Sequence, residues 1–209
     1  MLHLRKPSAA LTVSPSALVL LAAFLLLSRG LTLPAALLSA ALCHELAHVL
    51  TLHALHTPPR RLTLSATGAE LYVPDLHRLS YGGELLAAAA GPAVNLILAL
   101  LLGYGGRLWS PLYLFAGAQL VLGVFNLLPV LPLDGGSLLW NLAAWLTEPY
   151  TADRVAGVVG FGVAALLTLA AGAALMLGGS PFLLLAAAGL LWHSIAAIGG
   201  CQTAAKQVK

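Results

Sequence analysis

The amino-acid sequence predicts an all-α polytopic membrane protein, both from its composition and from the spacing of its apolar stretches. Hydrophobic residues make up 60% of the 209 residues and charged residues only 8%, whereas a soluble domain carries about a quarter charged residues. Apolar stretches near the length that crosses a bilayer, about 20 residues, alternate with short segments rich in polar residues, Gly or Pro. We therefore expect about six transmembrane helices in a single integral membrane domain over residues 1–209.

The apolar stretches place the predicted spans. They cover approximately residues 17–27, 33–55, 84–102, 112–131, 155–177 and 182–198. Basic residues precede the first stretch, but Ser28-Arg29-Gly30 follows it in place of the cleavage site of a signal peptide, so we expect an uncleaved span. A short helix from Gly136 to Leu146 contains two Trp residues and is expected at the membrane interface, because indole rings favour that region.

The distribution of Lys and Arg predicts the orientation in the membrane. With six spans both termini lie on one side, and eight of the ten basic residues fall there. These are Arg5, Lys6, Arg60, Arg61, Arg78, Arg154, Lys206 and Lys209, with Arg29 and Arg107 opposite. Because cytoplasmic segments carry an excess of Lys and Arg, we expect both termini to face the cytoplasm.

The second span carries three ionisable residues within five positions. His44 and His48 are four residues apart, and residues at this spacing share one face of a helix. Imidazole nitrogens suit zinc, so the pair can hold one metal ion. Glu45 is turned by about 100° from His44, so it can act on a water molecule beside the metal without being a ligand. Ionisable groups at membrane depth are costly and indicate function.

A third zinc ligand is expected from elsewhere in the chain, because a catalytic zinc keeps three protein ligands and one water. Of the seven carboxylates, Asp134 alone is framed by Pro and Gly directly after an apolar stretch, in Leu131-Pro132-Leu133-Asp134-Gly135-Gly136. The predicted orientation puts it on the same side as the His pair, within a partly re-entrant segment. The residues therefore predict zinc-dependent hydrolysis of peptide bonds, with Glu45 accepting the proton of the attacking water.

Three segments, taken together and in this order, resemble the site-2 protease family of intramembrane zinc metalloproteases. They are His44-Glu45-Leu46-Ala47-His48, Gly91-Pro92-Ala93-Val94-Asn95, and the sequence FNLLPVLPLDGG that ends at Gly136. The resemblance implies a catalytic core at about 33–140, with additional helices at about 155–198. It also implies Zn²⁺ as cofactor, with His44, His48 and Asp134 as its ligands and Glu45 as the catalytic base.

Two amides also match positions of that family close to the active site. The resemblance implies a catalytic role for Asn95 and Asn126, because an amide can hold a substrate backbone or an oxyanion. Hydrogen bonding between helices in lipid is the open alternative for both.

The compact size and the cytoplasm-facing site are similar to the bacterial branch that includes the stage IV sporulation protease. The resemblance then implies regulated intramembrane proteolysis of a membrane-associated protein substrate, such as a sigma-factor or transcription-factor precursor. The chain departs from that enzyme because no CBS domain is expected, and no PDZ-like insertion is seen in the sequence. The substrate and its regulation therefore stay open.

The polar segment after the second span contains a possible small β-hairpin. Residues 61–73 alternate in character and are rich in strand formers on both sides of Gly68, which is typical of two strands and a turn. One hypothesis is that an edge of this hairpin pairs with an unwound substrate and presents it in extended form. A connecting hairpin without a substrate role is the alternative.

Other functions have weaker support in the sequence. No basic run interleaves with aromatic residues, so nucleic-acid binding is not expected. A membrane zinc transporter would need further ligands along a path, and a catalytically silent scaffold would be expected to lose one of the four residues that this chain keeps. His53 and His56 are expected to pack at the membrane interface and not to bind metal. A role for His193 in the active-site cavity has weaker support.

Overall fold

The computed structural model describes residues 10–15, 18, 22, 25, 30–65, 68–74 and 78–207. The first predicted span, at about 17–27, therefore lies outside the described residues apart from three single positions. The described helices are α2 (Thr32–Ala54), α3 (Tyr81–Gly105), α4 (Leu112–Asn126), α5 (Asp134–Leu146), α6 (Pro149–Met176) and α7 (Pro181–Gln207). The strands are β1 (Ala10–Val13), β2 (Arg61–Ser65) and β3 (Gly68–Tyr72).

Three of these helices have the character of membrane spans. By length and composition, α2, α3 and α6 are each able to cross a bilayer, whereas α4 and the Pro181–Ala196 part of α7 are apolar but shorter. The mainly helical membrane protein that the sequence predicts is thus confirmed, and the count of six spans is not.

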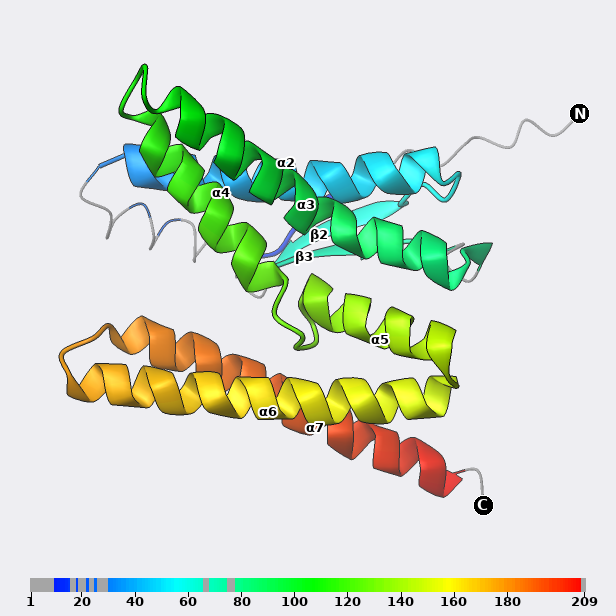
Figure 1. The fold of residues 1–209 in the computed structure, drawn as a ribbon. Coiled ribbons are helices and arrows are strands. Elements are labelled where there is room, and N and C mark those ends of the chain that lie inside the picture. Colours follow the sequence, from blue (N-terminus) through cyan, green and yellow to red (C-terminus); the bar gives the residue numbers. More distant parts are fainter. Residues whose placement is uncertain are drawn as a thin grey trace, which may run out of the picture.

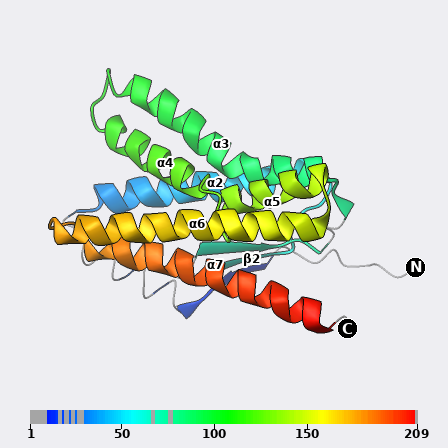
Figure 2. The ribbon, with the colours of Figure 1, turned by 60° about the horizontal axis from the view of Figure 1, so that its bottom comes forward.

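The helices form two groups joined through α5 (Figure 1). In the first group α2, α3 and α4 contact one another, and in the second α6 packs against α7. α5 contacts α3 on one side and α6 on the other, and it runs alongside α6 in two views (Figures 1 and 2). Residues of α2 and α5, far apart in sequence, are thereby brought to the same region of the bundle.

Small residues lie at the contacts between helices, and large apolar residues face outward. Ala36 and Ala40 of α2 are fully buried against Ala118 of α4, whereas Leu42 and Leu46, on the opposite face of α2, are exposed. Helices in lipid gain little from burying Leu, so small residues that let backbones approach closely are favoured at their contacts. The outward Leu residues thus form a surface suited to lipid.

The starts of α3 and α6 follow from their local sequence. The Ser80 hydroxyl accepts a hydrogen bond from the Gly83 amide at 3.2 Å, which satisfies a donor in the first turn of α3. α6 begins with Pro149 in its first turn, where a missing amide proton costs nothing. Both helices begin earlier than the predicted spans at 84 and 155.

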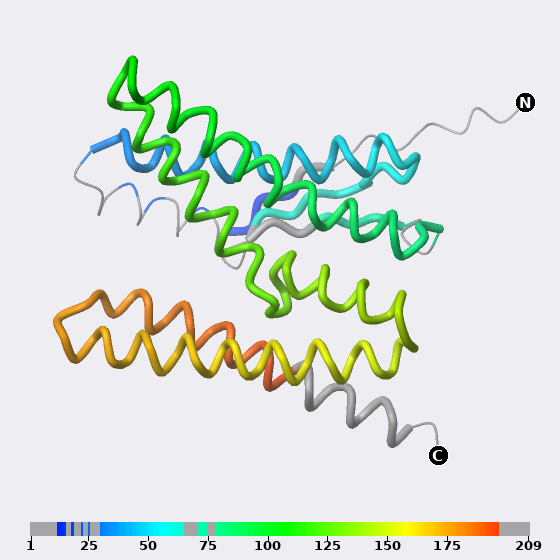
Figure 3. Tube along the Cα trace, in the orientation of Figure 1, coloured from blue at the N-terminus to red at the C-terminus, as the bar shows by residue number. Residues whose placement is uncertain are grey.

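The fourth predicted span, 112–131, forms a shorter helix in the structure. α4 ends at Asn126, the Leu131–Pro132 peptide is cis, and α5 begins at Asp134, two residues before the predicted helix. The tube in Figure 3 shows the chain turning between the end of α4 and the start of α5. The two prolines of this turn, Pro129 and Pro132, lack an amide proton and so cannot continue a helix. Asp134 therefore begins a new helix directly after the turn that follows α4.

The predicted β-hairpin is present and belongs to a larger sheet. β2 and β3 pair antiparallel, and β1 pairs with β2 in parallel, which gives the strand order β1-β2-β3. β1 was not predicted, because a four-residue strand whose partner lies about fifty residues along the chain leaves no local pattern. β3 lies at one edge of the sheet.

Candidate metal centre

Helix α2 supplies two imidazoles to one buried point. His44 and His48 are 5% and 8% exposed, and their ring centroids are 4.8 Å apart. They lie on the face opposite the exposed Leu42 and Leu46, as the spacing of four residues requires. The helix thus presents apolar side chains to lipid and both imidazoles to the interior.

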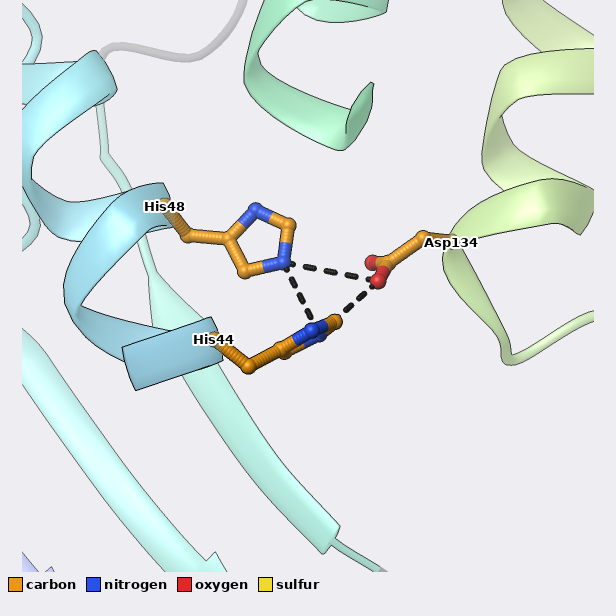
Figure 4. A group of neighbouring side chains, drawn as sticks. All are labelled: His44, His48 and Asp134. Carbon is orange, nitrogen blue, oxygen red and sulfur yellow. Dashed lines mark hydrogen bonds and ion pairs between the residues drawn. The ribbon is translucent and has the colours of Figure 1, made fainter. Parts of the chain in front are cut away.

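Asp134, the first residue of α5, meets this pair from the other side (Figure 4). Its Oδ2 atom lies 3.0 Å from His44 Nε2 and 3.4 Å from His48 Nε2. The two Nε2 atoms are 3.2 Å apart. The three residues form a group that could hold a metal ion, with one ligand atom from each. The structure thus brings together all three metal ligands expected from the sequence.

The protonation pattern of the three residues fits a cation. The Nδ1–H group of His48 donates to the Ala87 carbonyl at 2.7 Å, so the Nε2 atom of the neutral ring carries a lone pair. The buried Oδ2 atom of Asp134 faces the Nε2 atoms of both imidazoles and is directed at the same point. Tetrahedral zinc with bonds of about 2.0–2.1 Å would separate its ligand atoms by about 3.3 Å, close to the three distances observed. The donor set therefore fits zinc.

Gly91 of α3 allows that helix to cross directly over the two imidazoles. A Cβ atom at this position would come within 2.6 Å of His44 Cε1 and closer still to His48 Nε2. Any larger residue would displace the rings. The motif Gly91-Pro92 was noted in the sequence, but its contact with the His pair was not foreseen, because it depends on how α3 crosses α2.

Glu45 lies beside the three candidate ligands. It follows His44 in α2, is half-buried, and is close enough to His44, His48 and Asp134 to interact with them electrostatically. This is the position of a group that acts next to the metal without completing its ligand set.

The two asparagines differ in their surroundings. Asn95 is fully buried, and its Nδ2 atom points to the Ala40 carbonyl of α2 at 3.5 Å. This contact between α3 and α2 is the hydrogen bonding between helices that was the alternative to a catalytic role. Asn126 is half-buried at the end of α4, directly before the break that leads to Asp134. The catalytic roles expected for them stay predictions.

Several polar residues lie away from the metal group. His53, His56 and His193 are exposed and do not belong to the described group of candidate ligands. Gln119 of α4 is only 2% exposed, and its Oε1 atom has no partner among the described residues. The sequence analysis missed this residue, although a lone Gln within an apolar stretch is a signal for a buried polar group.

A cavity of about 490 Å³ reaches the metal group from the side of α5 and the sheet. Its lining includes His48 and Asp134, together with Leu71 and Val73 at the end of the hairpin. A second cavity, of about 550 Å³, is lined by Tyr81 and Trp145 among others. The two cavities share Glu84 and Trp140, so they adjoin. A cavity thus reaches the buried metal group on this side.

Comparison with known proteins gives a family match and a fold match. Residues 103–170 match the family model described as Peptidase family M50; this segment contains Asn126 and Asp134 and follows the His pair. The fold is similar to that of the site-2 protease from Methanocaldococcus jannaschii, with a TM-score of 0.68, 19% sequence identity and 93% of each chain covered. No curated protein matches the sequence. The family model supports the resemblance over residues 103–170, and the structural match shows a similar fold.

Proposed function

We propose that this chain is an intramembrane zinc metalloprotease of the site-2 protease type, which hydrolyses peptide bonds of membrane-associated proteins. The observation that carries the proposal is the convergence of His44 and His48 of α2 with Asp134 at the start of α5, with ligand atoms 3.0–3.4 Å apart. A structural pair of histidines would not require a carboxylate buried against it. The match of residues 103–170 to Peptidase family M50 supports the same activity.

The residues of the site divide the chemistry between them. His44, His48 and Asp134 would hold the ion, and zinc at such a site supplies Lewis-acid activation of a water molecule and of a carbonyl oxygen. Glu45 accepts the proton of the attacking water and passes it to the amine that leaves. The Ala87 carbonyl keeps the His48 ring in one tautomer and orientation, as partners of metal-bound histidines commonly do.

The substrate is expected to enter as an extended chain from the side of the sheet. β3 is an edge strand, and Leu71 of β3 lines the cavity that reaches His48 and Asp134. An edge strand can add an extended peptide through main-chain hydrogen bonds. We propose that β3 receives the unwound substrate in this way and holds it against the metal centre.

The charges at the two ends of the bundle support a cytoplasmic site in a bacterial inner membrane. Arg78 precedes α3 and Arg154 lies in the first turns of α6, whereas Arg107 follows the other end of α3. With the excess of basic residues facing the cytoplasm, cleavage would release cytoplasmic fragments. A sigma-factor or transcription-factor precursor would be such a substrate. Labelling of Arg107→Cys, but not of Arg154→Cys, by an impermeant thiol reagent in intact cells tests this orientation.

The Glu45→Gln variant tests the mechanism. The purified chain with zinc, in detergent, is incubated with a membrane-protein fraction, and new peptide termini are identified by mass spectrometry. We expect the wild-type chain to generate such termini, and Glu45→Gln to retain zinc but to lose cleavage by at least about 100-fold, because the proton acceptor is gone.

The matched control is Glu148→Gln, which removes an exposed carboxylate between α5 and α6. This variant should cleave like the wild-type chain. Cleavage by Glu45→Gln at the wild-type rate would refute the assigned mechanism, and absence of zinc from the wild-type chain would refute the metal centre.

A further inference from the structure

An acidic and aromatic groove extends from the metal centre and is not used by the chemistry above. We define the acidic groove by Glu84, Asn141 and Asp153, with the rings of Tyr81 and Trp140, all of which line one or both of the adjoining cavities. It lies where the start of α3, the end of α5 and the start of α6 come together (Figure 1). One end of the groove is at His48 and Asp134.

The aromatic wall of the groove is held in place by contacts among its own residues. The Trp140 Nε1–H group donates to Asp153 Oδ1 at 2.6 Å, which joins α5 to α6. The Tyr81 and Trp140 rings meet edge to face, with centroids 6.5 Å apart, which joins α3 to α5. The indole plane and the Asp153 carboxylate are therefore positioned together before any ligand arrives.

The buried Asn141 side chain indicates which kind of ligand would fit the groove. Asn141 is 6% exposed, and its Nδ2 atom donates to the Ser137 carbonyl at 3.0 Å, which fixes the amide orientation. Its buried Oδ1 atom has no donor among the described residues, and an acceptor left without a donor costs free energy. The Glu84 carboxylate interacts with this same side chain. The carboxylates of Glu84 and Asp153 thus give the groove an excess of acceptors, which suits a ligand rich in N–H groups.

The chain does not supply that ligand from the cavity walls. Among the described residues, neither cavity is lined by Lys or Arg. Two carboxylates beside an indole ring suit an organic cation, because ammonium and guanidinium groups bind to carboxylates and to aromatic faces alike. Arg suits this site especially, since its guanidinium is planar and carries five N–H donors.

We propose that the acidic groove is a specificity subsite that binds a Lys or Arg side chain of the substrate close to the scissile bond. This inference rests on the proposed protease function and names the class of substrate it prefers. Membrane proteins carry Lys and Arg next to the cytoplasmic ends of their spans. A chain that enters along β3 would bring such a residue past the groove as the scissile bond reaches the metal centre.

The test measures binding of paired peptides to the full-length Glu45→Gln chain loaded with zinc, in detergent. Each labelled peptide has an apolar segment and a flank with one Arg, placed at each successive position, or with citrulline, its neutral isostere, at the same position. Fluorescence anisotropy should show the best Arg peptide binding about tenfold more tightly than its citrulline partner. A second substitution, Glu84→Gln or Asp153→Asn, should bring this ratio towards one, whereas Glu148→Gln should leave it unchanged.

Reversing the charge of Glu84 distinguishes loss of the subsite from a defect in folding. Glu84→Lys should reverse the preference, so that a peptide with Glu in place of Arg binds more tightly than the Arg peptide. A ratio near one for every Arg position in the zinc-loaded chain would overturn the subsite. So would a second zinc ion per chain that is lost in Glu84→Gln, because the carboxylates would then be metal ligands.

Failure of the subsite and failure of the proposed function give different experimental results. If the wild-type chain cleaves the membrane fraction but the Arg and citrulline peptides bind equally, only the subsite is wrong. If the Arg preference is present but Glu45→Gln cleaves like the wild-type chain, the assigned mechanism is wrong and the basic-ligand site remains.

Discussion

At the level of single residues, the His48 imidazole has both of its nitrogens engaged. Nδ1 donates to the Ala87 carbonyl at 2.7 Å, and Nε2 faces Asp134 at 3.4 Å and His44 at 3.2 Å. The acceptor is a main-chain carbonyl of α3, so substituting the Ala87 side chain does not remove it. The orientation of the His48 ring therefore depends on how α3 packs on α2. A spacing of four residues predicts two imidazoles on one face, but it does not predict which ring nitrogen faces the metal.

Gly91 offers a test of how closely α3 must approach the imidazoles. Gly91→Ala should weaken zinc binding by about 10- to 100-fold, the range seen when residues that orient metal ligands are changed, because its Cβ would displace both rings. Competition with a chromophoric zinc chelator measures the affinity. Gly117→Ala is the control, since a Cβ at that position has no neighbour within 4 Å. Equal zinc affinity for Gly91→Ala and the wild-type chain would contradict this packing.

The two asparagines should separate into a structural and a catalytic residue. Asn95→Ala should lower the free energy of unfolding by about 1 kcal/mol, because it removes a buried contact between α3 and α2. Asn126→Ala should lower kcat/KM by about 100-fold, with little change in stability, if its amide holds the substrate or an oxyanion. Thermal unfolding and cleavage are measured for both variants. Loss of cleavage in Asn95→Ala without any loss of stability would reverse the assignment for that residue.

At the level of elements, the break between α4 and α5 determines where the carboxylate lies. Gly135 and Gly136 pack directly against the backbone of residues 127–131, so the turn folds tightly on itself. The Val130 side chain is fully buried against Ala164 of α6 and Leu190 of α7. The second group of helices therefore supports the turn that carries Asp134, although it provides no metal ligand among the described residues.

The edge strand β3 gives a prediction about substrate binding. Successive residues of a strand direct their N–H groups alternately to the two sides, so only every second residue of Gly68–Tyr72 can donate to an added chain. Proline scanning of β3 should reduce cleavage at these alternate positions, with zinc content unchanged, because Pro removes the donor. The remaining positions should instead disturb pairing with β2 and lower stability. Cleavage that survives Pro at every outward position would show that the hairpin is only a connection.

At the level of the whole molecule, a metal ion would tie together parts of the chain about ninety residues apart. Two ligands lie on α2 in the first group of helices, and the third begins α5, which joins the first group to α6. An ion bound only by the folded chain adds to its stability by mass action. The metal centre is thus expected to stabilise the packing of the two groups as well as to perform the chemistry.

Metal removal tests this link. At a free zinc concentration of about 100 times the Kd, the ion should add about 2.7 kcal/mol to the free energy of unfolding. Chelation should therefore lower the thermal midpoint of the wild-type chain. Asp134→Asn, which retains the side-chain shape but loses the charge, should respond much less to the chelator. The same shift in both proteins would mean that the three residues do not share an ion.

How much could be predicted from sequence depends on whether the signal is local. Composition and the apolar stretches predicted a helical membrane protein, and the strand-forming pattern at 61–73 predicted the β2–β3 hairpin, because both depend on neighbouring residues. The pair His44 and His48 was predicted for the same reason, through helical periodicity. The strand β1 and the contact of Gly91 with the rings were missed, since each depends on segments distant in the chain.

The sequence by itself determined the lipid-facing helices, the spacing of the two imidazoles and the chemical types of the candidate ligands. Only the tertiary structure decided that Asp134, at the start of α5, lies 3.0 Å from His44, and that an acidic groove leads away from it. The physical reason is that helix periodicity acts over a few residues. The meeting of α2, α3 and α5 arises instead from close packing of small residues on helices far apart in the chain.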